Sequence, residues 1–498
     1  MMTKWQIMAG IIMTCSLVTA ETLDITPYLG DNWYGLYFNG EKVGYLVKRI
    51  TVNEREEVEV LEDARFRVTM SGAKQGMSIM TKRSYAKDGK LLSIDMEMQD
   101  PAQSSSFHAL VQGDEMVMKS ALGGAVREES FPRPQESLND ALRDALWIRS
   151  NPEPGAVLNF SVFEPMYQKE VMGMSRIAGV EERIFNGVST KIYEVHSVLD
   201  LMDIESTSFV AEDGTTVEDL VSDVFTMRLE PEDSAKDVDY TVDTMVSNAV
   251  ILPEGISDAR SRPWLRLRLT GPLREAHLFN DIRQHMALLD DQVDFYAEKT
   301  DLSLLDIPTL PLEDPELLRH TRPSAYIQSD DPRLIEKARE IVGDETNILK
   351  ASQKICSWVY GNMKSVYSAR LSNALDALES LEGDCTEYTV LFVGLACAAG
   401  IPAKISAGLI YVEGARPGFY FHQWATVWMG EWIDVDPAFN QIPVDVTHIK
   451  LAEGDLFRQA RILPLIGRLA ISLQDEPLNR EEIPDDIENA GEESLPEE

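Results

Sequence analysis

The sequence predicts an α+β protein in which an antiparallel β-rich part precedes a C-terminal part of helices followed by strands. Asn39-Gly40 and Asp88-Gly89 each lie between two strand-like runs, and both dipeptides favour the positive φ angles of a two-residue hairpin turn. Towards the C-terminus, apolar residues at helical spacing up to Gly400 give way to alternating strands that end at Val435. Helices followed by antiparallel strands indicate an α+β fold.

Residues 1–20 have the features of a signal peptide. Lys4 is followed by the apolar stretch Ile7–Val18, and Val18-Thr19-Ala20 places small residues before Glu21, where a signal peptidase would cut. An uncleaved anchor is the alternative, although this stretch is short for a span that needs about 20 residues. We therefore expect an exported protein, periplasmic or extracellular, without stable membrane insertion after cleavage.

The chain is strongly acidic. It has 498 residues, with 46 Lys and Arg against 83 Asp and Glu, a net charge of −37. Such a field repels phosphate backbones and anionic membranes, so nucleic acid is not expected as a partner. Acids dominate residues 475–498, where Arg480 is the single basic residue. We expect this acidic tail to be disordered, because it has too little apolar surface to bury.

Residues 21–300 are expected to form one or two antiparallel β-rich domains, a choice that the sequence leaves open. One helix is expected over Leu138–Ile148. The predicted strands are Trp33–Phe38, Glu41–Ile50, Ser78–Tyr85, Leu91–Met98, Val157–Phe163, Lys191–Val198, Ser206–Val210 and Leu265–Leu269.

Residues 301–324, rich in Pro, Leu and Asp, are interpreted as a linker to a domain over 325–465. In that domain Asp331 and Pro332 should begin a helix that Gly343 ends. Further helices are expected along Ile348–Met363, along Ala374–Leu381 and from Cys385 to Gly400, followed by the strands Ala403–Val412, Phe419–Val427 and Trp432–Val435. A fragment of about 315–474 is expected to fold alone.

Cys385 is the cysteine placed for chemistry. Cys15 is lost with the signal peptide, whereas Cys356 and Cys397 lie on apolar helix faces, where a thiol is usually an inert core side chain. Cys385 instead follows Gly383-Asp384 at a predicted helix N-terminus. The helix dipole and free N–H groups there favour the thiolate, the form that attacks carbonyl groups.

A hairpin supplies partners for this thiol. If Trp428-Met429-Gly430 is a three-residue turn, His422 lies directly opposite Asp436 on one sheet face, with Asp434 diagonal to His422. A base and a group that orients it are what a cysteine nucleophile requires. Asp434 is the alternative orienter, and His448 is a further residue expected near the site.

These residues stand in motifs that resemble the bacterial transglutaminase-like superfamily. The motifs are Gly383-Asp384-Cys385-Thr386-Glu387-Tyr388, Gly400-Ile401-Pro402-Ala403-Lys404, His422-Gln423-Trp424, Trp432-Ile433-Asp434-Val435-Asp436-Pro437 and Thr447-His448-Ile449. The resemblance covers about 325–455 and implies a papain-like core. Cys385 would be the nucleophile, His422 the general base and acid, and Asp436 the orienter. Tyr388 departs from the histidine of many members and is expected to tune the site.

The resemblance implies acyl transfer at amide bonds of proteins or peptides through an acyl-thioester, resolved by an amine or by water. An exported binding or scaffold protein with an inactive papain-like domain is the alternative. The sequence has no His-Glu-x-x-His or Cys-x-x-Cys metal motif and no Gly-rich phosphate loop, so no cofactor is expected. Some members of the superfamily depend on calcium, which leaves that dependence open. The oligomeric state is also open.

Overall fold

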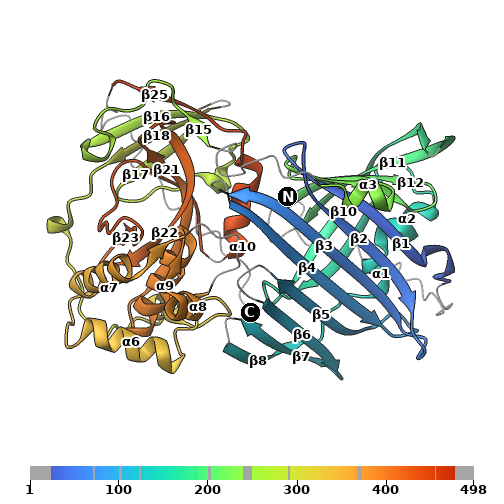
Figure 1. Ribbon diagram of the computed structural model, residues 1–498, viewed down its shortest axis with the longest axis horizontal. Coiled ribbons are helices and arrows are strands. Elements are labelled where there is room, and N and C mark those ends of the chain that lie inside the picture. Colours follow the sequence, from blue (N-terminus) through green and yellow to red (C-terminus); the bar gives the residue numbers. More distant parts are fainter. Residues whose placement is uncertain are drawn as a thin grey trace, which may run out of the picture.

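The computed structural model describes residues 24–70, 73–99, 104–122, 125–185, 187–199, 204–238, 249–289, 292–366, 373–454 and 456–476. Two halves lie side by side, an N-terminal sheet and a C-terminal mixed part, with the short helix α10 (Leu456–Gln459) at their junction (Figure 1). The predicted signal peptide and all but the first two residues of the predicted tail lie outside the described residues. Within the described residues, no helix combines the length and apolar character needed to cross a membrane.

The N-terminal half is a 14-stranded antiparallel meander. Its strands are β1 Gly30–Phe38, β2 Glu41–Val52, β3 Val58–Met70, β4 Ala73–Tyr85, β5 Leu91–Gln99, β6 Ser104–Gln112, β7 Glu115–Leu122, β8 Ala125–Pro132, β9 Val157–Glu164, β10 Lys169–Phe185, β11 Val188–Leu199, β12 Ile204–Ala211, β13 Thr216–Val221 and β14 Phe225–Leu229. Strands that are neighbours in sequence pair, except β8 and β9. Because β1 pairs with β14 instead, β8 and β9 form the two edges. Both predicted hairpins are present. Asn39 and Gly40 form the expected two-residue turn with positive φ, whereas the second hairpin has a longer loop between Tyr85 and Leu91, in which Gly89 but not Asp88 has positive φ.

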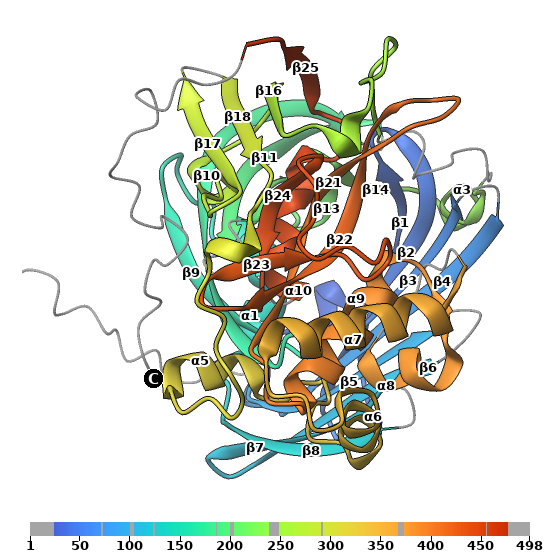
Figure 2. The ribbon, with the colours of Figure 1, turned by 90° about the vertical axis from the view of Figure 1, so that its left-hand side faces the viewer.

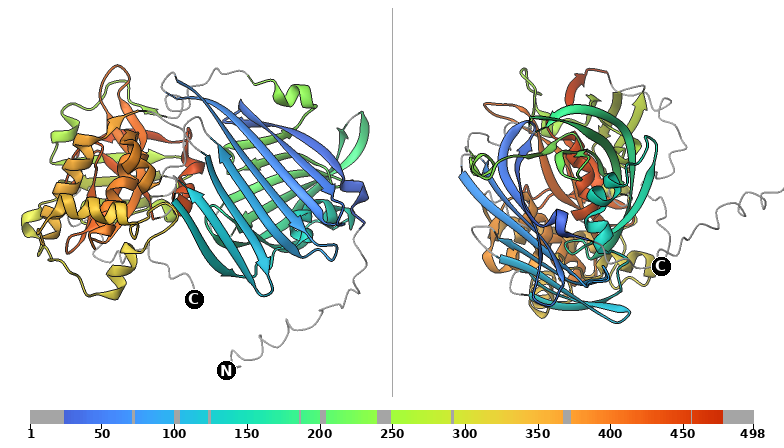
Figure 3. Two further views of the ribbon diagram at one scale, coloured as in Figure 1. Left: turned by 60° about the horizontal axis from the view of Figure 1, so that its bottom comes forward. Right: turned by 90° about the vertical axis from the view of Figure 1, so that its right-hand side faces the viewer.

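The sheet is strongly curled, and its concave side holds the helices α1 (Leu138–Ala141) and α2 (Arg143–Arg149) (Figure 3). The single helix predicted over Leu138–Ile148 is therefore broken at Leu142, which has φ −110°. Leu138 packs with buried residues of β3 to β7, and Ile148 packs with β10 to β12. The outer face carries α3 (Glu232–Lys236), whose Lys236 lies over the ring of Trp33.

Side chains form hydrogen bonds with the backbone of β9 along the open edge of this strand. The Glu136 carboxylate accepts the N–H of Phe163 at 2.7 Å, and Arg83 donates to the carbonyl of the same residue at 3.2 Å. Asp140 accepts the N–H of Ser161 at 3.3 Å. Arg83 and Glu136 are themselves 3.2 Å apart as an ion pair. Backbone groups that lack a neighbouring strand are thus satisfied by carboxylate and guanidinium groups.

The C-terminal half contains three sheets. A five-stranded sheet has the order β15-β22-β21-β24, with β23 also paired to β22, and a four-stranded sheet has the order β17-β18-β16-β25; β19 and β20 form a two-stranded pair. Their bounds are β15 Val250–Ile251, β16 Trp264–Thr270, β17 Gln284–Leu289, β18 Gln292–Glu298, β19 Lys364–Ser365, β20 Glu382–Gly383, β21 Ala403–Val412, β22 Gly418–Trp428, β23 Trp432–Val435, β24 His448–Glu453 and β25 Ala470–Gln474.

Helices α6 to α9 pack together beside the five-stranded sheet (Figure 2). The helices and short 3₁₀ turns of this half are α5 Pro315–Leu318, α6 Pro332–Val342, α7 Ile348–Asn362, α8 Ala374–Ser380, α9 Cys385–Ala398, η2 Ala259–Ser261, η3 Glu275–His277, η4 Leu302–Leu304, η5 Arg319–Thr321 and η6 Ala460–Leu465; η1, Thr26–Tyr28, precedes β1. The predicted caps of α6 are present: the Asp331 side chain accepts the N–H of Arg333, and Gly343 ends the helix at φ 62°.

The five-stranded sheet contributes to two cores. Val427 and Val435 pack with helices α6 to α9, whereas Leu409 and Ile449 pack with Leu267 of the four-stranded sheet. Strands β16 to β18 therefore share a core with β21 and β24. These three strands lie before residue 300, so the C-terminal half begins earlier in the chain than the predicted end of the β-rich domain. The predicted boundary is wrong at this point, because non-local packing of apolar faces is not marked in local sequence.

The segment predicted as a linker, 301–324, also packs on the C-terminal half. Leu302, Leu305, Leu310 and Leu312 lie against the helical core. Beyond it, Ala325 is buried among residues of the N-terminal sheet, and the Tyr326 hydroxyl donates to the carbonyl of Met166 at 3.0 Å. This segment and the two residues that follow it therefore make packing contacts with both halves, in addition to linking them covalently.

Candidate active site

Cys385 is the first residue of α9, as the sequence predicts. The Asp384 side chain accepts the N–H of Thr386 at 3.0 Å, and the Glu387 carboxylate accepts the N–H of Asp384 at 2.7 Å. This capping box fixes the first turn of the helix. A Cβ on Gly383 would lie 2.3 Å from the Cβ of Glu387, so only glycine fits before the cap. Cys385 is half-buried, whereas Cys356 and Cys397 are buried.

A threonine fixes α9 against the strand that carries His422. The hydroxyl of Thr389 lies 2.7 Å from the Cys385 carbonyl oxygen and 3.1 Å from that of Gln423. One side chain thus contacts the backbone of the nucleophile candidate and the residue that follows His422. Nearby, the hydroxyl of Tyr388, the position that departs from the family pattern, donates to the carbonyl of Met363 at 2.9 Å. Tyr388 supports the helix through that bond.

His422 and Asp436 lie together, although not in the predicted register. The pairs are Thr426 with Asp434 and Trp428 with Trp432. The loop is therefore Met429-Gly430-Glu431, one residue later than expected, with Gly430 at φ 93°. This moves the pairing by two residues, so that Asp436 follows the last paired residue and lies diagonal to His422. A shift of two keeps both side chains on the same face.

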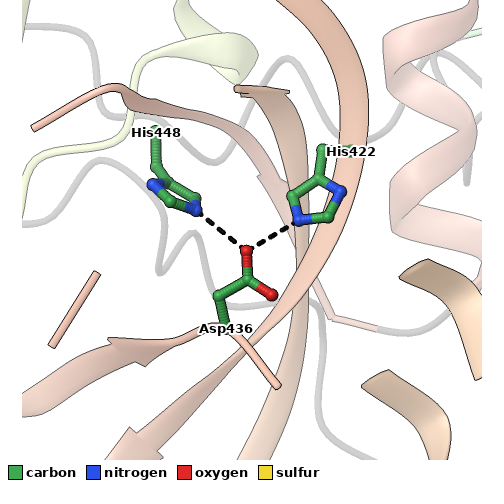
Figure 4. A group of neighbouring side chains, drawn as sticks. All are labelled: His422, Asp436 and His448. Carbon is green, nitrogen blue, oxygen red and sulfur yellow. Dashed lines mark hydrogen bonds and ion pairs between the residues drawn. The ribbon is translucent and has the colours of Figure 1, made fainter. Parts of the chain in front are cut away.

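The carboxylate of Asp436 holds two imidazoles at one oxygen. Its Oδ2 lies 2.8 Å from Nε2 of His422 and 3.1 Å from Nε2 of His448 (Figure 4). Its Oδ1 accepts the N–H of Ala438 at 2.8 Å. Burial would raise the pKa of Asp436, but the two imidazoles outweigh it and hold that pKa well below the usual range. Asp436 is therefore ionised.

The ring of His422 is oriented by this bond. Because an ionised carboxylate only accepts hydrogen bonds, Nε2 of His422 carries a proton, and Nδ1 is the nitrogen left for Cys385. Burial disfavours the charged ring, but Asp436, with a hydrogen bond to the Cys385 thiol, raises the pKa of His422 to about 9. At neutral pH the imidazole is therefore held in its protonated form beside the thiol.

Asp434, the alternative orienter, belongs to a different group of side chains. Its carboxylate lies 2.7 Å from Nζ of Lys450 and 3.1 Å from Nη2 of Arg283, and it accepts a 2.6 Å hydrogen bond from Thr426. Burial opposes ionisation of Asp434, but the charges of Lys450 and Arg283 lower its pKa. The partners of Asp434 are thus two permanent cations and a hydroxyl, whereas His422 is bonded to Asp436.

Aromatic side chains surround the His422 ring. Trp424 stacks on it with ring centroids 6.0 Å apart, and Phe439 meets it edge-on at 5.6 Å. Phe439 is 39% exposed, so it offers an apolar surface beside the imidazole. The guanidinium of Arg260 lies 4.3 Å from the centre of the Phe439 ring. The sequence does not mark Phe439 or Arg260 as site residues, because a single residue outside the periodic strands and helices gives no pattern to recognise.

Among the described residues, three side chains of the candidate site have donor atoms close enough together to hold a metal ion. Donor atoms of His422, Asp436 and His448 lie within 4.8 Å of one another. The hydrogen bonds between these atoms account for that spacing. His108 and His196 lie far from this group in sequence and pair with carboxylates on the N-terminal sheet.

Comparisons with known proteins identify a family for part of the chain. The family model described as the transglutaminase-like superfamily matches residues 335–437. No curated protein matches the chain.

Three solved structures are similar to the chain. A candidate cysteine protease from Cytophaga hutchinsonii is 19% identical, with a TM-score of 0.28, covering 43% of this chain and 84% of that one. A candidate protease from Parabacteroides distasonis is 11% identical, with a TM-score of 0.20, covering 81% of this chain and 71% of that one. A β-barrel-like protein of a domain of unknown function from Brucella abortus is 10% identical, with a TM-score of 0.33, covering 40% and 94%. Residues 335–437, in the C-terminal part of this chain, thus form a domain of the transglutaminase-like superfamily, preceded by a large β domain.

Proposed function

We propose that the chain is an exported cysteine-dependent enzyme that transfers acyl groups from amide bonds of proteins or peptides through an acyl-thioester. The observation that carries the proposal is the His422 ring, which Asp436 holds at Nε2 and whose pKa is raised by Asp436 and by the Cys385 thiol. A thiol at a helix N-terminus beside a protonated imidazole is the arrangement that favours a thiolate nucleophile.

The first half of the reaction uses two groups of the chain. The Cys385 sulfur bonds to the amide carbonyl carbon, and the electrons of the carbon–oxygen double bond move to oxygen. The tetrahedral species collapses with breakage of the carbon–nitrogen bond, and the proton on Nδ1 of His422 goes to the departing amine. Asp436 keeps the ring oriented and stabilises its charged form. The N-terminus of α9 favours negative charge at this point.

The second half regenerates the thiolate. An amine or a water molecule gives a proton to Nδ1 of His422 as it attacks the thioester carbonyl carbon, and the Cys385 sulfur leaves. An amine yields transamidation, and water yields hydrolysis. Both outcomes share every group described above, so the triad serves a transamidase or a protease equally. How well water is kept from the thioester decides between them.

Alkylation of the thiols tests the proposal. With iodoacetamide at pH 6, Cys385 should react about 100-fold faster than the buried Cys356 and Cys397, because an ordinary thiol is under about 1% thiolate at that pH. Burial raises the pKa of both Cys356 and Cys397 to about 12. His422→Ala should slow the reaction of Cys385 towards the rate of an ordinary accessible thiol, because the imidazolium that favours the thiolate is lost. Equal, slow labelling of all three thiols in folded protein would instead favour a scaffold with an inactive domain.

Intact-mass detection identifies the reaction. After exposure to a peptide library, wild-type protein should carry an acyl adduct that Cys385→Ala lacks. A primary amine that shortens the life of the adduct and appears in the product indicates transamidation. An adduct that decays at the same rate with and without amine indicates hydrolysis.

The proposal also covers the cell compartment and the domain limits. Export predicts that mature protein begins at Glu21, which N-terminal sequencing of secreted material checks; retention of Met1 or Met2 would mean an anchor. A protein or peptide is the proposed partner, and nucleic acid is not proposed as one because the acidic chain repels phosphates. The catalytic domain is proposed over 325–465, together with strands β16 to β18 that complete its core.

A further inference from the structure

His448 meets carboxylates at both ring nitrogens. Its Nε2 is hydrogen-bonded to Oδ2 of Asp436 at 3.1 Å, whereas its Nδ1 lies 3.4 Å from Oδ1 of Asp445, an ion-pair contact that does not have the geometry of a hydrogen bond. The side chain is fully buried, and its ring centroid is 6.1 Å from that of His422 (Figure 4). A neutral imidazole has one N–H and one lone pair. In the neutral form, one nitrogen of His448 would direct its lone pair at an anionic oxygen.

The second carboxylate is held in place independently of His448. Asp445 accepts hydrogen bonds from the Thr447 N–H at 2.9 Å and from the Gln441 amide at 2.9 Å. Arg260 lies 4.0 Å from its Oδ2. Because Asp445 is anchored by these donors, it is a fixed negative charge beside His448. Burial opposes charging of His448, but Asp436 and Asp445 raise its pKa.

Other charged groups near His448 come from each element packed around it. His422 projects from β22, Arg283 precedes β17 and donates to the His448 carbonyl at 2.7 Å, and Lys450 follows on β24 with Nζ on Asp434. Trp424 meets the His448 ring edge-on at 5.2 Å and supplies no charge. Asp436 and Asp445 are thus the charged groups in direct contact with the ring.

We infer that His448 is a positioning residue that remains an imidazolium and clamps the Asp436 carboxylate in the orientation that His422 needs. The inference deepens the proposed function and rests on it for its catalytic meaning. In this arrangement negative and positive groups alternate: the Cys385 thiolate, the His422 imidazolium, the Asp436 carboxylate, the His448 imidazolium and the Asp445 carboxylate. The positive charge of His448 also weakens the hold of Asp436 on the His422 proton. His448 therefore sets the pH at which His422 releases its proton.

The direct test is the protonation state. In ¹⁵N-histidine NMR of the full chain at pH 8, both nitrogens of His448 should carry protons, with assignment by loss of the signal in His448→Gln. The same result is expected in Cys385→Ala, which has no nucleophile, so this arm is independent of catalysis. An ordinary titration of His448 near pH 6.5 would overturn the inference.

The functional test is the pH dependence of Cys385 alkylation. In His448→Gln the step assigned to His422 deprotonation should move to higher pH by about one unit, because a positive charge near Asp436 is lost. The double variant His448→Gln/Asp445→Asn, which leaves no buried unpaired carboxylate, should show the same shift. His108→Gln, the same substitution at an exposed histidine–aspartate pair, is the matched control and should show none.

The two failures are distinguishable. If the profiles of folded His448→Gln and of the double variant match wild type, His448 only fills space, and the inference is wrong while the proposed function stands. If wild-type Cys385 is no more reactive than Cys356, the proposed function fails, whatever the NMR shows. A third outcome is a shifted alkylation profile in His448→Gln together with a wild-type profile in His448→Gln/Asp445→Asn. The shift would then come from the unpaired Asp445 carboxylate, and the inference would be overturned.

Discussion

Asp434 and Asp436 are two residues apart on one sheet face, yet the regions around them differ in kind. Asp434 is surrounded by Lys450, Arg283 and Thr426. Asp436 is surrounded by two imidazoles and a backbone N–H. Both carboxylates are buried and both have lowered pKa values. Burial and ionisation alone therefore do not identify the residue that acts in chemistry.

The difference lies in whether a partner can release its proton between about pH 6 and the His422 pKa of about 9. Lysine and arginine keep their protons in that range, so the Asp434 group is a fixed ion cluster that ties β23 to β24 and to the four-stranded sheet. Histidine exchanges protons there, so the Asp436 group can take part in proton transfer. The comparison distinguishes a carboxylate held by permanent cations from one held by titratable imidazoles, and it suggests substitutions that act on one group only.

The largest effect should come from removing the four-stranded sheet. A fragment of 315–474, expected from sequence to fold alone, lacks Arg283 and exposes the faces of Leu409 and Ile449 that pack on Leu267. It should show no cooperative thermal transition. A fragment of 249–476 keeps the shared core and should unfold cooperatively in calorimetry. Cooperative unfolding of the shorter fragment would mean that the shared core is dispensable.

Asp436→Asn should affect turnover more than stability. Loss of the carboxylate leaves His422 without its orienting charge, and turnover should fall on the order of 10²–10⁴-fold. Alkylation of Cys385 should slow less, since the contribution of the α9 N-terminus remains. Steady-state kinetics and alkylation rates on the same preparation provide the check, and an unchanged turnover number would remove Asp436 from the proposed triad.

Asp434→Asn should instead affect stability more than the reactivity of Cys385. Lys450 and Arg283 would lose the carboxylate that they share, at a cost of about 3 kcal/mol in the free energy of unfolding. The alkylation rate of Cys385 per folded molecule should stay close to wild type. Urea denaturation combined with alkylation of the folded fraction measures both effects. If turnover fell further here than in Asp436→Asn, the orienter would have to be reassigned to Asp434.

Alkaline pH should weaken the Asp436 group alone. The pKa of His422 is raised to about 9, so its contribution to stability is complete below the unfolded pKa of about 6.5 and is lost as the pH rises through about 9. Stability should fall by about 1–3 kcal/mol over this window, and by less in His422→Gln. Asp434 has a lowered pKa, so its contribution is lost on the acid side, below about pH 4.

Thr426→Val should have the smallest effect. The Thr426 hydroxyl donates to Asp434 and lies 2.6 Å from the hydroxyl of Ser406. Its loss should cost about 1–2 kcal/mol, because Asp434 retains both cations. The pH profile of Cys385 alkylation should not change. A shifted profile would show that the two carboxylate groups are coupled through the strand.

Much of the site could be predicted because it depends on local patterns. The capped start of α9 at Cys385 follows from Asp384 and Glu387, and alternation places His422 and Asp436 on one face even when the pairing is two residues off. The register itself was missed because Gly430 fits a turn as either its second or its third residue. A loop residue such as Asp445, which faces His448, has no periodic signal to mark it.

The rest of the fold depends on contacts between distant segments. The first hairpins are marked by Asn39-Gly40 and Asp88-Gly89, but pairing of β1 with β14 joins residues nearly 200 positions apart. Likewise, Leu265, Leu267 and Leu269 predict a strand without saying that it packs against β21 and β24. Alternation identifies an apolar face, and tertiary packing decides which partner covers it.

The bonds made by Glu136, Arg83 and Asp140 along β9 have a consequence between molecules. An exposed edge strand is a template for a strand of another chain, the first step of β-aggregation. At Phe163 and Ser161 the donors are already bonded to carboxylates of the same chain. An incoming strand would have to displace those carboxylates and leave their charges beside its own backbone. This stretch of the sheet margin is therefore protected from polymerisation by three polar side chains rather than by a further strand.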